Sequence, residues 1–244
     1  MRANFRMQRL HVDDPLIAGG SIEADRDQFH YLVHVLRMED GDAVLLFNGR
    51  DGEWSARLAF DGRKKLSLRV GERTRPQPPA PDLHYLFAPL KQARLDYTVQ
   101  KAVEMGVGRI QPALTHHTQS PKINVHRLER NAIEAAEQCG VLSIPECRTP
   151  AGLAELIADW PPGRRLIYCD EAAETHNPLA ALKAVTESRL ALLIGPEGGF
   201  SDQERALLKT QPFVTAVPLG PRILRADTAA VAALALVQAT IGDW

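Results

Sequence analysis

The feature that most constrains this chain is a pair of glycine-bearing turns near its C-terminal end, each of which follows a short apolar run. Residues 191–194 lead into Gly195-Pro196-Glu197-Gly198-Gly199, and residues 215–219 lead into Gly220-Pro221. Short apolar runs bounded by turn residues predict buried strands, and glycine, which has no Cβ, lets the backbone approach a ligand closely. Because an open α/β sheet holds its ligand beyond the carboxyl ends of its strands, the two turns predict one shared binding site.

The spacing of these glycines excludes two nucleotide-binding motifs. The dinucleotide fingerprint requires G-x-G-x-x-G, which Gly195, Gly198 and Gly199 do not match, and a P-loop requires a terminal Gly-Lys-Ser/Thr that this turn lacks. A simpler alternative is that each turn only redirects the chain between a strand and a helix. Ser201 and Glu204 have the spacing of a capping box, so a helix is predicted to begin directly after the first turn.

Several motifs along almost the whole chain resemble one class of enzymes. The two turns read IGPEGGFS at 194–201 and LGPRILR at 219–225. The other segments are HYLVHVLR at 30–37, Lys91 followed by DYTVQKAVEMGV at 96–107, and AIEAAEQCG at 132–140. Together they resemble the SPOUT class of RNA methyltransferases and, more narrowly, the RsmE-type enzymes that methylate uracil N3 in 16S ribosomal RNA.

The sequence pattern divides the chain into two domains. Residues 1–74 are typical of a small β-rich domain, with strands expected at 9–12, 43–47 and 54–60 and a helix at 25–37. Residues 75–82 are rich in proline and predict a semi-rigid linker. Residues 83–244 alternate strand-like runs with helices expected at 94–105, 125–139 and 227–241, which predicts an α/β fold with a helix-covered parallel sheet. The resemblance implies that the first domain is a PUA-like, RNA-binding β-barrel and that the second is a SPOUT domain with a deep trefoil knot.

The resemblance also implies that S-adenosylmethionine is the cofactor. Adenine is a flat apolar ring with polar edges, and aliphatic walls with backbone amides and carbonyls suit such a ring. The resemblance places cofactor contacts in the first turn at Leu193, Ile194, Gly195, Pro196, Glu197, Gly198 and Gly199. It places others in the second turn at Leu219, Gly220, Ile223, Leu224 and Thr228.

Two arginines of the second turn, Arg222 and Arg225, are the candidate catalytic residues. Uracil N3 lies on the Watson–Crick edge, so the target base must be unpaired or flipped out, and the negative charge that develops there requires a cation or donors nearby. A planar guanidinium can hold the uracil oxygens or a phosphate. The alternative is that one of these arginines pairs with Glu197 or Asp227 and holds the two turns together. No residue is an evident general base.

The charge balance limits how the chain can hold RNA. A formal net charge of −1 and a pI of about 6.7 exclude binding dominated by overall positive charge. Local patches must therefore supply the contacts. The candidates for contact with the 16S ribosomal RNA or the small subunit are Arg9, Arg37, Arg63, Lys64, Lys65 and Lys91. For the N-terminal group, the alternative is that exposed basic side chains only solvate a small barrel.

Other features point away from metals, disulfides and membranes. The three cysteines form no C-x-x-C pair, and the adjacent His116 and His117 lack a third ligand at metal-binding spacing. No apolar run approaches the ~20 residues of a membrane span, and a cytoplasmic location is expected. The apolar helix expected at 227–241 must be buried in its own domain or against another subunit, and the resemblance favours a homodimer.

Three departures from the family pattern leave alternative functions open. The usual Arg-Thr-Glu-Thr-Ala is Arg225-Ala226-Asp227-Thr228-Ala229 here, His116-His117 replaces a common Glu-Arg, and Val141 stands where an arginine often occurs. One alternative is a non-catalytic RNA-binding or ribosome-assembly factor on the same fold. Another is a SPOUT methyltransferase that acts on a different RNA nucleotide.

Overall fold

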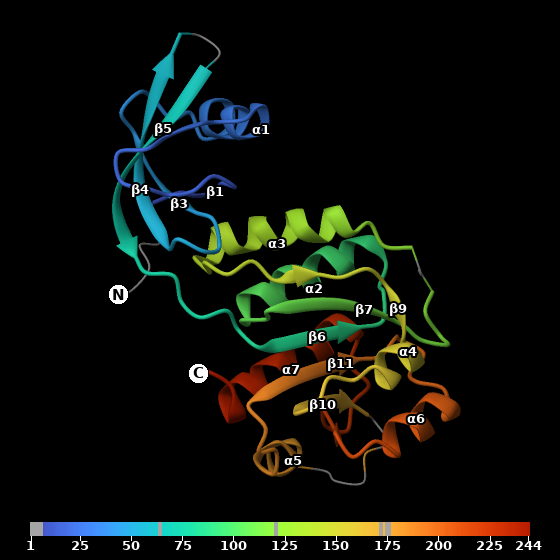
Figure 1. Ribbon diagram of the computed structural model, residues 1–244. Helices are drawn as coiled ribbons and strands as arrows, with labels where there is room; N and C mark the ends of the chain where they lie inside the picture. Colours follow the sequence, from blue (N-terminus) through green and yellow to red (C-terminus); the bar gives the residue numbers. More distant parts are fainter. Residues whose placement is uncertain (1–6, 63–64, 120–121, 171–172, 174–176) are drawn as a thin grey trace. The chain divides into compact units, whose positions relative to one another are not determined.

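A computed structural model describes residues 7–62, 65–119, 122–170, 173 and 177–244 (Figure 1). The chain divides into two compact units, one comprising Met1–Ala80 with Ile133–Ile144 and the other Pro81–Ala132 with Pro145–Trp244. The boundary near residue 80 falls within the stretch predicted as a linker. The assignment of Ile133–Ile144 to the first unit is not anticipated by the local sequence pattern.

Hydrogen bonds inside the first unit explain why Ile133–Ile144 belongs to it. The backbone N–H of His11 donates to a carboxylate oxygen of Glu137 at 2.8 Å. The guanidinium of Arg75 donates to the carbonyl oxygen of Gly140 at 3.0 Å. These partners are far apart in sequence, so no local periodicity could predict them.

The first unit contains a five-stranded sheet in the order β1-β3-β4-β5-β2. Its strands are β1 (Arg9–His11), β2 (Ser21–Glu23), β3 (Ala43–Phe47), β4 (Glu53–Asp61) and β5 (Lys65–Arg75). The β1–β3 pair is parallel and the other pairs are antiparallel. The expected strands are confirmed, whereas β2 was missed because it has only three residues and one buried apolar side chain, Ile22.

The helix expected at 25–37 is shorter and consists of two parts. Asp25 and Gln28 form a capping box at the start of α1 (Arg26–Phe29). A π-helical segment, η1 (His30–Val35), follows directly, and the N–H of Leu36 donates to the carbonyl of Tyr31 at 2.9 Å. The buried residues Leu10, Leu32, Val44, Leu46, Leu58 and Leu68 belong to one hydrophobic core.

The second unit is built on a parallel sheet in the order β12-β10-β11-β6-β7-β8, with β9 paired to β7. Its strands are β6 (Leu83–Phe87), β7 (Arg109–Leu114), β8 (Glu146–Cys147), β9 (Ala151–Gly152), β10 (Arg164–Cys169), β11 (Arg189–Ile194) and β12 (Val214–Val217). Its helices are α2 (Gln92–Glu104), α4 (Leu153–Ala158), α5 (Pro178–Lys183), α6 (Asp202–Lys209) and α7 (Ala226–Ile241), and α3 (Val125–Cys139) crosses the boundary between the units. This alternation confirms the predicted α/β class.

The two faces of this sheet are buried by different helices. On one face, Leu166 and Leu193 pack with Leu153 of α4 and Leu208 of α6. α7 packs against α2 and β11, and its Gln238 side chain donates to the carbonyl of Met105 at 2.6 Å. Burial on both faces explains the uninterrupted apolar run of β11. Among the described residues, no helix is long and apolar enough to span a bilayer.

Candidate functional site

The register of three neighbouring strands brings the two glycine turns together. β10 pairs with β11 on one side and with β12 on the other, and all three run parallel. Tyr168 is opposite Leu193 and Cys169 is opposite Val217, so the three strands end at the same edge of the sheet. The turn after β11 and the turn after β12 therefore flank the end of β10, as the sequence predicts for a shared site.

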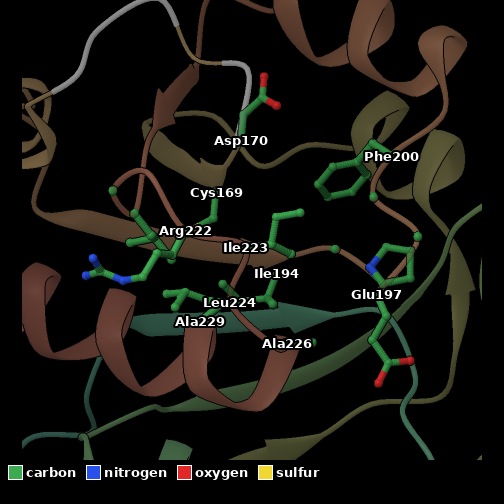
Figure 2. A pocket seen from close by; sticks show the side chains of 16 residues that line it. Cys169, Asp170, Ile194, Glu197, Phe200, Arg222, Ile223, Leu224, Ala226 and Ala229 are labelled. Carbon is green, nitrogen blue, oxygen red and sulfur yellow. The ribbon is translucent and has the colours of Figure 1, made fainter.

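A cavity of about 240 Å³ lies between the two turns and the start of α7. In Figure 2, Glu197 and Arg222 lie on opposite sides of this cavity, with Cys169 and Ile194 between them. Ten of the expected cofactor residues line it: Ile194, Gly195, Pro196, Glu197, Gly198, Gly199, Leu219, Gly220, Ile223 and Leu224.

Two expected cofactor residues do not line the cavity. Leu193 is fully buried in the core on one face of the sheet, where it packs with the α4 and α6 side chains. Thr228 is exposed on the first turn of α7. Side chains alternate across a strand, so Leu193 points away from the face on which Ile194 lies.

Sequence reasoning missed five of the lining residues. They are Cys169, Asp170, Phe200, Ala226 and Ala229. A sequence signal exists for Cys169 and Asp170, because they end the apolar run of β10 (Arg164–Cys169), a strand that ends at the same edge of the sheet as its parallel neighbours. The alanines belong to the helix that follows the second turn, and their small side chains leave room at the cavity wall.

The first turn is held in shape by close packing and by the helix that follows it. A Cβ added to Gly195 would lie 2.8 Å from Cε2 of Phe200, a distance that real Cβ atoms do not adopt. The N–H of Gly199 donates to the carbonyl of Pro196 at 2.9 Å, and Gly199 has a φ of +70°. Ser201 and Glu204 form the predicted capping box at the start of α6. The glycine at 195 is therefore required by sterics, because no side chain fits there.

Arg94, in the first turn of α2, links the first glycine turn to the start of α7. Its guanidinium forms an ion pair with the carboxylate of Glu197, and its Nε lies 3.9 Å from a carboxylate oxygen of Asp227. The sequence had suggested Arg222 or Arg225 as the alternative partner of these two acids. In the described part of the chain, the ion pairs of Glu197 and Asp227 both involve Arg94 instead.

Asp170 provides a buried carboxylate at the end of β10. Its side chain is 0% exposed, forms an ion pair with Arg205 of α6, and accepts a hydrogen bond from the Tyr168 hydroxyl at 2.8 Å. Burial raises the pKa of the neighbouring Cys169 thiol to about 12. Cys169 is therefore protonated at neutral pH and contributes a wall to the cavity without acting as a nucleophile.

The two adjacent histidines pack against the first turn. His117 Nδ1 lies 3.0 Å from the carbonyl oxygen of Gly199, and the N–H of His116 donates to Glu204 at 2.8 Å. A Cβ added to Gly198 would lie 3.3 Å from the Cβ of His117. Through these contacts the two histidines support the first turn from outside, and no group of three or more metal-ligating side chains occurs among the described residues.

The two candidate catalytic arginines occupy different positions. Arg222 lines the cavity with its aliphatic part, and its guanidinium extends outward (Figure 2). Arg225 is the N-cap residue of α7, and its carbonyl accepts the N–H of Ala229 at 2.8 Å. Both residues are exposed, and Ile223 between them is 95% exposed. The second turn thus presents two cations and one apolar side chain to the solvent.

One expected RNA contact, Arg9, is corrected by the structure. Its side chain is 2% exposed and its Nε lies 2.9 Å from a carboxylate oxygen of Glu53. Arg75 pairs with the same carboxylate at 2.7 Å. Although burial opposes ionisation of Glu53, hydrogen bonds from Arg75, Thr74 and Arg9 lower its pKa. Arg9 therefore stabilises the first unit from inside and is not presented to a phosphate.

The other expected RNA contacts lie on the surface or outside the described part of the chain. Arg37, Lys65 and Lys91 are exposed. Arg37 has a φ of +57°, in the left-handed region that non-glycine residues rarely adopt. Arg63 and Lys64 lie outside the described residues.

The chemistry of the cavity fits a nucleoside with an alkyl tail. Ile194, Leu219 and Leu224 supply aliphatic walls, and the glycines of both turns expose backbone donors and acceptors. The cavity is slightly smaller than the ~300–1,000 Å³ of typical ligand clefts and is partly open to solvent. Part of such a ligand would therefore face outward, where a second substrate can reach it.

Comparison with known protein families matches both units. The RNA methyltransferase domain family matches residues 76–238. The RNA methyltransferase PUA domain family matches residues 24–71. The first match includes both glycine turns and most of α7.

Curated proteins and solved structures resemble the chain over nearly its full length. It is 30% identical to the ribosomal RNA small subunit methyltransferase E of Rickettsia conorii over 96% of both chains. It is 31% identical to a Legionella pneumophila protein solved with the bound cofactor SAM, with a TM-score of 0.83 over 96% of this chain and 98% of that one. It is 25% identical to the ribosomal RNA small subunit methyltransferase E of Neisseria gonorrhoeae bound to S-adenosyl methionine, with a TM-score of 0.83 over 96% and 97% of the two chains.

Proposed function

This chain belongs to the RNA methyltransferase family that includes the ribosomal RNA small subunit methyltransferases E, and on this basis we propose that it uses S-adenosylmethionine to methylate N3 of a specific uridine in 16S ribosomal RNA. The observation that carries the proposal is the cavity enclosed by two glycine turns around the end of β10. Bound S-adenosylmethionine supplies an electrophilic methyl group on a sulfonium. The protein's part is to hold that group in line with the attacking nitrogen, and positioning of this kind supplies much of the acceleration.

The residues of the two turns have distinct tasks in this proposal. The aliphatic side chains of Ile194, Leu219 and Leu224 hold the adenine ring, and the backbone groups of residues 195–199 contact its polar edges and the ribose. Leu193 does not contact the cofactor directly in this proposal. It packs in the core and fixes the position of the end of β11. Thr228 lies at the start of α7, next to the second turn.

The arginines of the second turn act on the RNA. Uracil N3 must give up its proton, which passes to water because no residue is assigned as the base, and the negative charge spreads to the flanking carbonyl oxygens. In the displacement the N3–CH3 bond would form as the S–CH3 bond of the cofactor breaks, so the cofactor would leave as S-adenosylhomocysteine. Arg225 at the N-cap of α7 and Arg222 at the cavity edge place guanidinium groups where they can stabilise this charge or hold an adjoining phosphate. Their exposure to solvent is consistent with a substrate that arrives from outside.

The first unit extends the RNA contact in this proposal. The exposed Arg37 and Lys65, together with Lys91 of the second unit, are the basic side chains offered to the phosphates. These contacts position the RNA and carry no sequence information themselves. Recognition of the particular uridine must therefore come from the shape of the RNA or of the small subunit around it.

We extend the proposal to a homodimer and to the trefoil knot of the SPOUT class. The 95% exposure of Ile223 beside the cavity supports a dimer, because a second subunit would cover this side chain. Light scattering on the purified protein measures the mass directly. A monomeric mass at working concentration contradicts the dimer without affecting the proposed reaction.

The test is methylation of small subunits that lack the modification. Isotope-labelled S-adenosylmethionine should deliver its methyl group to 16S ribosomal RNA, and mass spectrometry of the digested RNA should identify N3-methyluridine. Arg225→Ala should reduce turnover far more than cofactor affinity. Absence of cofactor binding by calorimetry would favour a non-catalytic RNA-binding factor, and a different methylated base would favour another substrate nucleotide.

A further inference from the structure

The second unit contains another cavity, at the opposite edge of the parallel sheet from the glycine turns. Its volume is about 210 Å³, and it lies among the starts of β6, β7 and β10 and one side of α4. His84 and Arg109 face each other in register on the neighbouring strands β6 and β7. Arg148 and Arg164 complete the basic part of the lining.

The floor of this cavity contains a buried donor without an acceptor. The Arg164 side chain is 1% exposed, and its terminal nitrogens donate to Asp82 and to the carbonyl of Leu190. Within the described part of the chain, the Nε–H of Arg164 has no hydrogen-bond partner. An unsatisfied buried donor of a charged group is costly, and an acceptor in the adjoining cavity would relieve that cost.

The ion pairs around the cavity involve more guanidinium groups than carboxylates. Arg109 and Arg148 share the single carboxylate of Glu146, each at 2.8 Å. Arg164 shares the carboxylate of Asp82 with Arg189. Four guanidinium groups thus pair with two carboxylates, and the carboxylates of Glu155 and Asp159, which also line the cavity, bring the number of carboxylates to four.

The pKa of the His84 imidazole is affected by two of these arginines. Burial, followed by the charges of Arg164 and Arg109, lowers its pKa to about 3, although Asp82 opposes this shift. His84 is therefore neutral at pH 7 and adds no charge of its own. A neutral ring held among cations offers a hydrogen bond to a ligand without repelling either sign of charge.

Two acidic residues on α4 restrict the shape of the ligand. Glu155 and Asp159 also line the cavity, one helical turn apart, and both are exposed. They oppose a long polyanion lying across the opening. They leave room for one compact anion that reaches the floor, where Arg164 lies.

We propose that this cavity binds a single phosphate group, held by Arg164 at the floor and by Arg109 and Arg148 at the sides. Fork-shaped guanidinium groups match the oxygens of a tetrahedral anion. The phosphate can be free in solution or can be the terminal phosphate of an RNA strand. The site is separate from the glycine turns, and the inference does not depend on the proposed methyl transfer.

Thermal unfolding and calorimetry of the full chain in phosphate, against chloride at equal ionic strength, test the inference. We expect a dissociation constant on the order of 1 mM, and phosphate at about ten times this value should raise the folded-to-unfolded ratio about tenfold. Arg109→Gln and Arg148→Gln should each weaken binding at least about threefold. Arg130→Gln, an exposed position on α3, should bind phosphate like the parent chain.

A spectroscopic readout separates occupancy of the site from general stabilisation. NMR of the His84 ring, assigned with His84→Gln, should show a change in the chemical shifts of the ring at pH 7 when phosphate binds. A short RNA with and without a 5′-phosphate distinguishes the sources, since only the phosphorylated strand should compete if the terminal phosphate is the ligand. An identical response to phosphate and chloride, or an equal loss in the Arg109 and Arg130 variants, would overturn the inference.

Discussion

Arg94 on α2 and Glu197 in the first glycine turn form an ion pair that joins the helix to the turn. α2 follows β6, the turn follows β11, and these strands are adjacent in the sheet. The same guanidinium lies 3.9 Å from Asp227 at the start of α7. One side chain thus contacts both the turn that lines the first cavity and the helix that follows the second turn.

The first prediction concerns the ion pairs of Arg94 with Glu197 and Asp227. Arg94→Ala should raise the dissociation constant for S-adenosylmethionine roughly threefold to fivefold, because partly exposed ion pairs contribute ~0.2–1 kcal/mol and the turn loses order as well. Calorimetry measures the change. Arg127→Ala is the matched control, since it breaks an ion pair with Asp96 of α2 but touches neither turn. Equal affinities of the Arg94 and Arg127 variants would show that these ion pairs do not order the site.

The second prediction concerns the close approach at Gly195. Gly195→Ala places a Cβ 2.8 Å from a Phe200 ring that is 5% exposed and packed edge-on against Tyr168. Overpacking of this kind costs ~1–3 kcal/mol, so the melting temperature and the cofactor affinity should both fall.

Gly152→Ala is the control for this substitution. Gly152 is the N-cap residue of α4, and the nearest atom to its added Cβ is 4.0 Å away. Its melting temperature should remain close to that of the parent chain. If Gly195→Ala melts at the same temperature and binds cofactor normally, the Phe200 ring can move, and the steric account of this turn is wrong.

Features that depend on neighbouring residues were predictable from the sequence. Helix α3 has the bounds expected at 125–139, and the capping box of Ser201 and Glu204 forms as predicted. Both glycine turns follow strands, although β12 is only half-buried where β11 is buried, and ten expected cofactor residues line the cavity. In each case the determining interactions occur within a few residues along the chain, or follow from the rule that parallel strands end at one edge.

Features that depend on distant partners were not predictable. Arg94 and Glu197 are 103 positions apart, and their pairing requires knowing that β6 and β11 are neighbours. Arginine is a residue type that is usually found on the surface, yet the ion pair with Glu53 keeps the Arg9 side chain buried. A single sequence shows which side chains carry charge, whereas the strand order decides which charges meet.

The third prediction concerns the buried ion pair between Arg205 and Asp170. Arg205→Ala should destabilise the chain by about 3–5 kcal/mol, because it removes the guanidinium from a carboxylate that is 0% exposed. Urea unfolding measures the loss. Arg165→Ala is the comparison, since its partner Glu187 is 27% exposed and the expected cost is below ~1 kcal/mol. Similar losses in both variants would indicate that Asp170 is compensated by other groups.

The last prediction concerns Glu137, whose pKa burial raises to about 7 while the His11 N–H opposes the shift and Glu134 adds to it. The unfolded value is about 4.5. Between these two pH values Glu137 binds more protons in the folded chain than in the unfolded chain. Its contribution to the free energy of unfolding therefore falls as pH rises from about 4.5 to about 7, and it stays constant at higher pH. Glu137→Gln keeps an acceptor for the His11 N–H but cannot ionise. Its stability relative to the parent should therefore rise by about 2 kcal/mol between pH 5 and pH 8.

Urea unfolding at a series of pH values measures this difference, with Glu129→Gln, an exposed position on the same helix, as the control. The control should run parallel to the parent chain across the range. If the Glu137→Gln curve also runs parallel, the Glu137 carboxylate is already ionised at pH 5 in the folded chain. Its hydrogen bond with His11 would then be a charged one, and the segment Ile133–Ile144 would be held to the first unit most strongly above pH 5.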